Sequence, residues 1–429
     1  MPFATSEPVD GSVTPGPSRS RVRTIVVLGL LSTFGPISLD LYLPALPSLA
    51  VDLQTSTSAA QLSITACLLG LAVGQLVAGP LSDRYGRRRP LIIGLTLYLL
   101  ASGACAFAPS IEILLLLRLV QGLSGAAGLV VSRAIARDLY SGRALVIIFS
   151  RLILVSGLAP VLAPVIGGQL TAIMSWRGIF GVLAVFGVVL LLAGSFGLGE
   201  TLPVARRTTG GLGSTLRGFR RLLGDHLFVA VVASAGLAGA SMFAYIAGST
   251  FVLQRIYGLT PQGFSFAFGA NALGIMALGQ LGGRLAHRWT PHRVLALGLS
   301  INLVGAGALL TTVLVGLPLP FVLVSLFVMV AAIGLILPTS TALALADYPD
   351  QAGAASSLLG LGQYVAGALV APLVGIAGED TAVPLGVVAA GCSGLASLVF
   401  FGTALPALRR LHPPEPDELP PSSMDLPPA

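Results

Sequence analysis

Long apolar runs, separated by short clusters of charged residues, glycine and proline, make up most of this chain. A helix needs about 20 predominantly apolar residues to cross a bilayer. Twelve segments have this character, at 24–46, 59–80, 89–108, 111–134, 145–170, 178–199, 227–253, 262–286, 293–315, 318–346, 352–377 and 382–406. Their long runs differ from the ten-residue alternations of a membrane β-barrel. The pattern therefore predicts an all-α membrane protein with twelve transmembrane helices.

The amino-acid composition narrows the possible classes of protein further. Hydrophobic residues make up 55% of the 429 positions and charged residues 10%, whereas a soluble domain has about 25% charged residues. The chain has no lysine, which excludes a Walker A phosphate loop, because that loop holds the phosphates with a lysine. The four histidines and three cysteines lack metal-ligand spacing. We expect no catalytic residue, no metal and no cofactor, and the sequence favours a transporter driven by an ion gradient over an enzyme or receptor.

The arginines predict the topology. With the N-terminus inside, 20 of the 24 fall in cytoplasmic loops or tails, Arg177 and Arg255 fall in outer loops, and Arg118 and Arg151 fall within spans. Cytoplasmic loops of membrane proteins carry an excess of basic residues, so both termini are predicted to be cytoplasmic. The same loops account for the net charge of +7, and no nucleic-acid partner is expected.

The longest connection divides the spans into six and six. In it, Leu216–Leu223 alternates apolar and basic residues, which fits either a short helix on the inner membrane surface or a simple charged linker. The expected parts are a disordered cytoplasmic tail at 1–23, an N-terminal half at 24–199, a cytoplasmic linker at 200–226, a C-terminal half at 227–406 and a second disordered tail at 407–429.

A repeated segment relates the two halves. GPLSDRYGRRR, Gly79–Arg89, follows span two, and GRLAHRWTPHR, Gly283–Arg293, follows span eight, with glycine, leucine and arginine recurring at an offset of 204. Two parallel six-helix repeats are typical of one large transporter architecture. The second copy has His287 in place of Asp83, so only the first pairs a carboxylate with several arginines.

Several motifs resemble those of the major facilitator superfamily. GPLSDRYGRRRPL resembles its loop 2–3 signature, RLVQGLSGAAG its span-four motif with a membrane arginine, and GLAPVLAPVIGG the span-five motif of its antiporters. LDLYLPALPSLAVDL and SWRGIF resemble the bicyclomycin/chloramphenicol-resistance (Bcr/CflA) branch of drug:proton antiporters, and GFSFAFGANAL resembles a stretch of its phenicol exporters. The resemblance covers all but the two tails and implies the major facilitator fold in the plasma membrane.

The resemblance also implies a function. It suggests a proton-coupled antiporter that exports small hydrophobic drugs, phenicol- or bicyclomycin-like, by alternating access. The alternative is a major facilitator importer of a sugar or another small metabolite, and the antiporter motif argues against it. The expected partners are a hydrophobic small molecule, protons and the lipid bilayer, and we expect a monomer.

Two of the motifs suggest moving parts. In the loop 2–3 motif, arginines can reach acidic groups or helix C-termini, as a gate that breaks when the protein opens inward, although arginines that merely fix topology would look the same. In the span-five motif, small residues allow close helix approach and prolines bend the axis, which suits either a seal against proton leak or tight packing. The gate residues are Gly79, Asp83, Arg84, Gly86, Arg87 and Arg88, and the antiporter-motif residues are Gly157, Pro160, Pro164, Gly167 and Gly168.

Asp40 is the one carboxylate that falls well inside a predicted span. An ionisable residue at membrane depth is costly and indicates a functional site. With span one ending near Leu46, Asp40 and Arg118 each lie roughly 9 Å from the outer boundary, and the family fold implies that spans one and four line a central cavity. We expect Asp40 to take and release the proton while Arg118 tunes its proton affinity. A static ion pair that only joins two helices is the alternative.

The substrate cavity is expected to be apolar with a few hydrogen-bonding groups. Arg151, roughly 12 Å into span five, could face it or extend to the inner surface. Each of the other candidates could equally serve helix packing. The candidates are Tyr42, Gln61, Gln121, Arg151, Tyr245, Phe266, Asn271, Gln363 and Tyr364.

Overall fold

The computed structural model describes residues 18–207, 212–346, 348, 352–376, 378 and 380–411. Most of the two predicted tails lies outside these residues. The described parts of the tails are helical, since the first helix begins at Ser18 and the last ends at Leu411, so the expected disorder at 18–23 and 407–411 is wrong.

Every secondary-structure element among the described residues is a helix, and twelve segments are long and apolar enough to span a membrane. This confirms the predicted class and span number. The helices are α1 (Ser18–Ser32), α2 (Phe34–Asp40), α3 (Leu46–Asp52), α4 (Thr57–Tyr85), α5 (Arg88–Ala106), α6 (Ile111–Leu139), α7 (Gly142–Leu170), α8 (Trp176–Gly197), α9 (Leu212–Leu223), α10 (His226–Phe251), α11 (Pro261–Leu285), α12 (Pro291–Val315), α13 (Leu319–Ala331), α14 (Ile333–Ala346), α15 (Ala352–Val370), α16 (Val383–Val399) and α17 (Leu405–Leu411).

Capping residues, rather than the last apolar residue, set several helix ends. The Ser56 hydroxyl accepts a hydrogen bond from the Ala59 amide at the start of α4, and Asp225 and Thr260 cap α10 and α11 in the same way. Such side chains satisfy amides that the first turn leaves without partners. α4 then continues to Tyr85 and stops at Gly86, which has φ +88°. α4, with 29 residues, is therefore longer than the apolar run at 59–80 that predicted it.

The first span is broken into α1, α2, a 3₁₀ turn at Leu43–Ala45, and α3. Gly35, Pro36, Pro44 and Pro47 lie at or near the breaks, and proline removes an amide donor from a helix interior. The span therefore ends at Asp52, not near Leu46 as expected. The break leaves carbonyl groups of α2 without helical partners.

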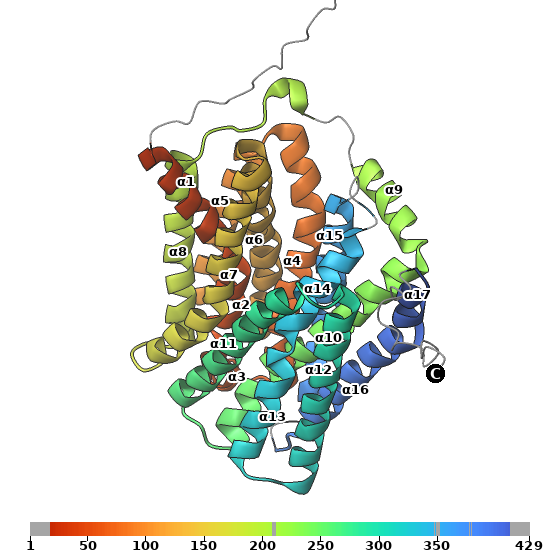
Figure 1. The fold of residues 1–429 in the computed structure, drawn as a ribbon. Coiled ribbons are helices and arrows are strands. Elements are labelled where there is room, and N and C mark those ends of the chain that lie inside the picture. The colour runs from red at the N-terminus through yellow and green to blue at the C-terminus, as the bar shows by residue number, and fades with distance from the viewer. Residues whose placement is uncertain are drawn as a thin grey trace, which may run out of the picture.

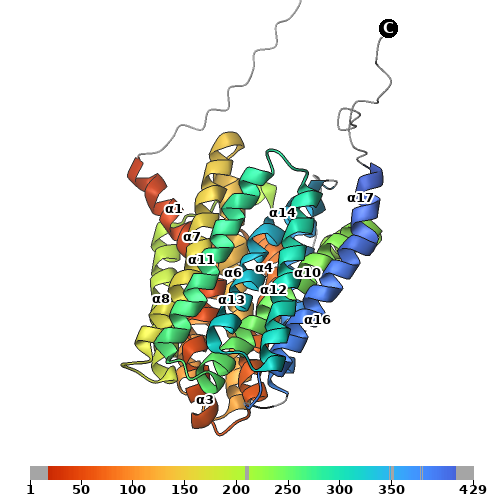
Figure 2. The same ribbon diagram turned by 60° about the horizontal axis from the view of Figure 1, so that its bottom comes forward.

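The two groups of helices lie side by side, with α1–α8 on one side and α10–α17 on the other (Figure 1). In Figure 2, α1 and α17 lie toward the upper end, and α3 lies at the lower end. We call the first the linker end, because the 200–226 connection and the α4–α5 turn are there, and the opposite one, with the 53–56 and 171–175 turns, the far end. α7 packs against α11, and α4 against α15, across the boundary between the groups.

The described linker residues contain a helix, so the helical alternative for Leu216–Leu223 holds. Phe219 and Leu222 on α9 are buried in a cluster with α10 residues, including Phe228 and Val231. Arg217 and Arg220 are exposed. α9 is thus an amphipathic helix fixed to the linker end of the second group.

Glycine allows α4 and α6 to pack closely. A Cβ at Gly122 would collide with the backbone carbonyl of Cys67, and one at Gly70 would collide with the Leu119 carbonyl. Helices in lipid depend on such close packing, because the surrounding lipid is as apolar as their side chains. The position of α6 relative to α4 is therefore fixed by backbone approach.

We expect Gly122→Ala to destabilise the protein by about 1–3 kcal/mol, as overpacking of a tight interior does. The measurement is the thermal unfolding midpoint of the purified protein in detergent. Gly181→Ala on α8 is the matched control, because a Cβ there meets nothing within 4 Å, and it should leave the midpoint unchanged or raise it. Equal midpoints for both variants would show that close α4–α6 packing does not limit stability.

Candidate functional site

A cavity of about 170 Å³ lies between the two groups of helices. Ligand pockets typically measure about 300–1,000 Å³, so a drug-sized molecule needs the two groups to separate. The residues that line it come from α2, α7, α10, α11, α13 and α15. They are Gly35, Pro36, Leu39, Asp40, Pro160, Met242, Phe243, Tyr245, Ile246, Phe268, Asn271, Ala272, Ile275, Val330, Gln363 and Tyr364.

Asp40 is the only charged residue in that lining. It lies at the end of α2, just before the chain departs from regular helix, and is 5% exposed. None of the four ion pairs between described residues includes it. Asp40 is thus a buried carboxylate whose neighbours across the cavity are mainly apolar and aromatic.

The second group supplies the polar groups that face Asp40. The Asn271 side-chain amide on α11 donates a 2.9 Å hydrogen bond to the Tyr245 hydroxyl on α10, and the Tyr245 ring stacks on Phe268 at 5.1 Å. The Tyr364 ring on α15 lies 6.1 Å from the Phe243 ring. The arrangement provides flat apolar surfaces with few hydrogen-bonding groups.

Of the nine residues expected in the cavity, the structure brings four to it: Tyr245, Asn271, Gln363 and Tyr364. Tyr42 and Gln121 are instead fully buried within the first group of helices. Gln61 is buried, and its side-chain amide donates 3.1 Å to the Ala247 carbonyl across the boundary. Arg151 is exposed on α7 and is not part of the lining.

The prediction that Phe266 lines the cavity is wrong. It is 60% exposed, whereas Phe264 and Phe268 are buried. Residues two positions apart on an α-helix face different directions, and those three or four apart share a face. The spacing of Phe264, Phe268 and Asn271 contained this signal. The apolar wall residues Met242, Ile246 and Val330 were also missed, because a search for polar groups passes over them.

Arg118 is fully buried in the first group of helices and makes its contacts without a carboxylate. Its guanidinium donates to the Ser38 carbonyl at 3.0 Å, to the Ser63 carbonyl at 3.3 Å and to the Gln121 side chain. It also lies over the Tyr42 ring, 4.5 Å from the centroid, which adds cation–π attraction. Backbone carbonyls and aromatic faces therefore take the place of a counter-ion.

This environment corrects two expectations about Arg118. No Asp40–Arg118 ion pair exists among the described residues, so the static-pair alternative is wrong for this conformation. Arg118 is also absent from the cavity lining. It does reach the Ser38 carbonyl, two residues before Asp40, and so holds the backbone that carries the carboxylate.

Hydrogen bonds join the two groups of helices toward the far end. The Gln254 side chain donates to the Pro44 carbonyl at 3.1 Å and Gln262 to the Gly168 carbonyl at 3.0 Å. Two hydroxyl groups of α4 also donate hydrogen bonds to carbonyls of the second group. Ser58 donates to the Pro372 carbonyl and Thr65 to the Ala368 carbonyl. In this conformation the far side of the cavity is closed by contacts between the two groups.

The loop 2–3 motif forms a charged network at the linker end. Arg87 pairs with Asp83 on α4, and its Nε lies 2.9 Å from the Asp138 carboxylate at the end of α6. The Arg88 side chain donates to the Ser195 carbonyl near the end of α8. Arg84 instead lies over the Tyr85 ring, and a Cβ at Gly79 would meet only Val130, at 3.9 Å. The network therefore ties α4, α6 and α8 within one group.

Glu200, which the sequence analysis missed, fixes the glycine turn. Its carboxylate accepts from the Arg87 amide at 2.8 Å and from the Arg88 amide at 3.3 Å, and a Cβ at Gly86 would collide with it. Burial raises the pKa of Glu200, but these amides and the Leu202 amide lower it by more, so the net pKa lies below its usual value. The stabilisation is therefore present at neutral pH and is lost as the pH falls through that lowered pKa.

The span-five motif lies where the two groups meet. A Cβ at Gly167 would collide with the Leu41 carbonyl in the first span, and one at Gly168 with the Ser265 side chain on α11. Pro160 lines the cavity and Pro164 is buried. Gly157 has no such role, since a Cβ there meets nothing within 4 Å. The end of α7 is thus held between the first span and α11 by backbone approach.

Solved structures share this fold. A mutant of the nucleoside transporter NupG superposes with a TM-score of 0.72 at 14% identity, covering 89% of this chain and 99% of that one. A bacterial homologue of the human lysosomal transporter Spinster, inward-facing and unoccupied, gives 0.70 at 16% identity, covering 90% and 99%. At these identities the likeness establishes the fold alone.

Sequence relatives agree with the motifs. The Major Facilitator Superfamily matches residues 28–372. An uncharacterized MFS-type transporter of Bacillus subtilis (strain 168), YdgK, is 39% identical over 90% of this chain and 96% of its own length. The bicyclomycin resistance protein homolog of Haemophilus influenzae is 29% identical over 88% and 95%, and the Escherichia coli (strain K12) multidrug resistance protein D is 30% identical over 58% and 62%.

These matches make the chain a transporter rather than an enzyme, and the spanning helices make it a multi-pass protein of the plasma membrane. The resemblance drawn from the motifs is confirmed. The chain belongs to the Major Facilitator Superfamily, in its bicyclomycin/chloramphenicol-resistance branch.

Proposed function

We propose that this protein is a proton-coupled antiporter that exports small hydrophobic drugs, phenicol- or bicyclomycin-like, across the plasma membrane. The observation that supports it most directly is a cavity between the two groups of helices with aromatic and apolar walls and one carboxylate, Asp40. Relatives named for bicyclomycin, chloramphenicol and multidrug resistance support the same substrate class. The protein would act as a monomer without a cofactor, with both termini in the cytoplasm.

Asp40 would couple proton transport to drug transport. Its carboxyl group would hold the proton in one state, and in its ionised form it would leave a polar site beside the bound drug. A drug that enters from the linker end displaces the proton from Asp40 to the cytoplasm. After the protein opens at the far end, the drug leaves and Asp40 takes a proton from outside. A proton thus moves inward as a drug moves outward, and the membrane gradient drives export.

Arg118 would act through the backbone in this scheme. Because it satisfies the Ser38 carbonyl at the broken end of α2, it holds Asp40 facing the cavity while remaining outside the cavity itself. The proposed role for Arg118 is therefore to position the proton carrier.

We expect Asp40→Asn to abolish proton-driven export, with at least about a tenfold loss of transport rate, because an amide cannot take up and release the proton. Drug sensitivity is measured in an exporter-deficient bacterium against a panel that includes phenicols and bicyclomycin. The release of protons that follows addition of drug is measured in membrane vesicles. Glu112→Gln is the control, since Glu112 is exposed at the start of α6.

Two results would contradict this proposal. Export that remains proton-driven in Asp40→Asn would remove Asp40 from the mechanism. A wild-type protein that gives no drug resistance but supports downhill uptake of a sugar would indicate an importer instead.

The gate residues around Arg87 would act at the linker end by holding α4, α6 and α8 of the first group in the arrangement in which this end closes against the second group. We expect Asp138→Asn to cost about 1–3 kcal/mol, as the loss of a hydrogen bond to a charged partner does, and to slow export. Thermal unfolding and vesicle transport measure the two effects. Arg177→Gln is the matched control, because the Arg177–Asp52 pair is exposed and such pairs contribute about 0–1 kcal/mol. Normal stability and normal export in Asp138→Asn would exclude a gate at this pair.

A further inference from the structure

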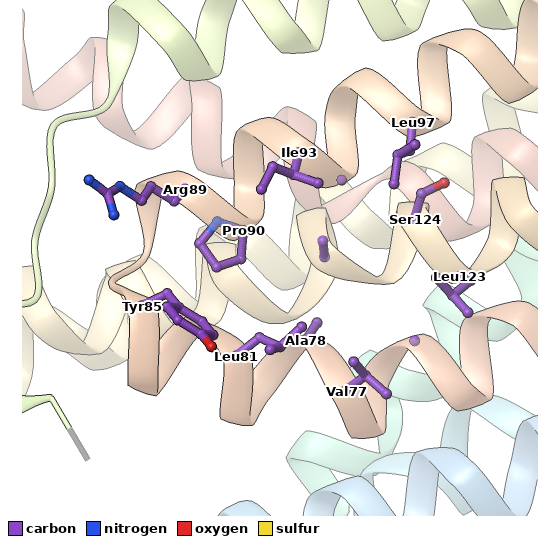
Figure 3. A pocket seen from close by; sticks show the side chains of 13 residues that line it. Val77, Ala78, Leu81, Tyr85, Arg89, Pro90, Ile93, Leu97, Leu123 and Ser124 are labelled. Carbon is purple, nitrogen blue, oxygen red and sulfur yellow. The ribbon is translucent and has the colours of Figure 1, made fainter. Parts of the chain in front are cut away.

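A second cavity, of about 380 Å³, lies outside the proposed transport path. α4 and α5 form its two walls and α6 its floor (Figure 3). Both walls pack against α6, and they contact each other only a little, which leaves a groove between them. None of its lining residues belongs to the Asp40 cavity.

The groove has an apolar body. Leu81 on α4 and Ile93 and Leu97 on α5 project into it (Figure 3), and these three side chains are 41%, 61% and 42% exposed. Small residues form the deeper surface, namely Gly74, Ala78, Gly94 and Ala127. Because these spans lie in a bilayer, apolar side chains exposed on the outside of the bundle meet lipid, so the groove is open to an acyl chain.

A positive charge marks one end of the groove. Arg89, in the first turn of α5, lines it at the linker end together with Tyr85 (Figure 3). Arg89 is exposed, and none of the ion pairs between described residues includes it. The Arg84 guanidinium lies over the Tyr85 ring, 5.3 Å from its centroid. The apolar groove therefore ends beside two arginines at the level of the helix ends, where lipid headgroups lie.

We propose that this groove binds an anionic phospholipid of the cytoplasmic leaflet, with an acyl chain between α4 and α5 and its phosphate at Arg89. The charge selects the lipid class, because anionic headgroups gather at basic residues on the cytoplasmic side of membrane proteins. The site does not depend on which molecule the protein exports.

The bound lipid would stabilise the α4–α5 turn. Arg87, two residues before Arg89, pairs with Asp83 and Asp138, and Glu200 holds the amides of Arg87 and Arg88. A phosphate at Arg89 would restrain the start of α5 in the position that this network requires. The lipid site would thus favour the conformation described here.

Native mass spectrometry of the purified full-length protein tests the site. Phosphatidylglycerol and phosphatidylcholine with identical acyl chains are added in turn, and bound lipid is counted. We expect phosphatidylglycerol to bind more tightly and to raise the thermal unfolding midpoint. Arg89→Gln should weaken phosphatidylglycerol binding about fivefold, the effect of one basic residue near an anionic surface, and should leave phosphatidylcholine binding unchanged.

Two further variants localise the effect. Arg293→Gln removes the arginine at the corresponding place in α12, 204 positions later, and should leave binding unchanged. Leu97→Trp adds bulk inside the groove and should weaken phosphatidylglycerol binding as Arg89→Gln does.

The proposal fails if the two lipids bind equally, if Arg89→Gln and Arg293→Gln have equal effects, or if Leu97→Trp has none. It also fails if an exported drug displaces the lipid from the groove, which would make this a drug site. Loss of lipid binding with drug export retained would leave the proposed transport function intact.

Discussion

A guanidinium buried among the helices governs the organisation of the first half. Arg118 cannot be left without acceptors at this depth, because an uncompensated charge in an apolar interior is very costly. Its Nε and Nη1 donate to the Ser63 and Ser38 carbonyls and to Gln121, and the guanidinium lies over the Tyr42 ring. The Ser38 carbonyl is available because the first span breaks soon after it. The break in the first span, the orientation of α6 about its axis and the burial of Tyr42 therefore all provide contacts for Arg118.

These contacts keep Arg118 apart from Asp40. Arg118 is buried within one group of helices, while Asp40 faces the cavity between the groups. An ion pair would have fixed the carboxylate in its ionised form. Without it, the environment of Asp40 depends on how closely the second group approaches, as the proposed coupling requires.

The contacts at the two ends differ in kind. At the far end, single side chains of one group bond to backbone carbonyls of the other. At the linker end, the Arg87 and Glu200 network lies within the first group. Glycines at 122 and 167 let backbones meet directly within the first group, whereas single side chains bridge the two groups.

The sequence by itself determined the class, the number of spans and the family, and it singled out Asp40, because apolar length, motifs and the cost of charge in a bilayer act locally along the chain. Only the tertiary structure decided which side chains meet. Phe266 and Phe268 are equally aromatic, yet a turn of about 200° along α11 places only Phe268 in the cavity. Arg118 and Asp40 lie at neighbouring levels, but the direction of each side chain depends on how its helix packs. Glu200 completes the network around Arg87 from 113 residues beyond it, a relation set by the packing of α5 on α8 that no local pattern contains.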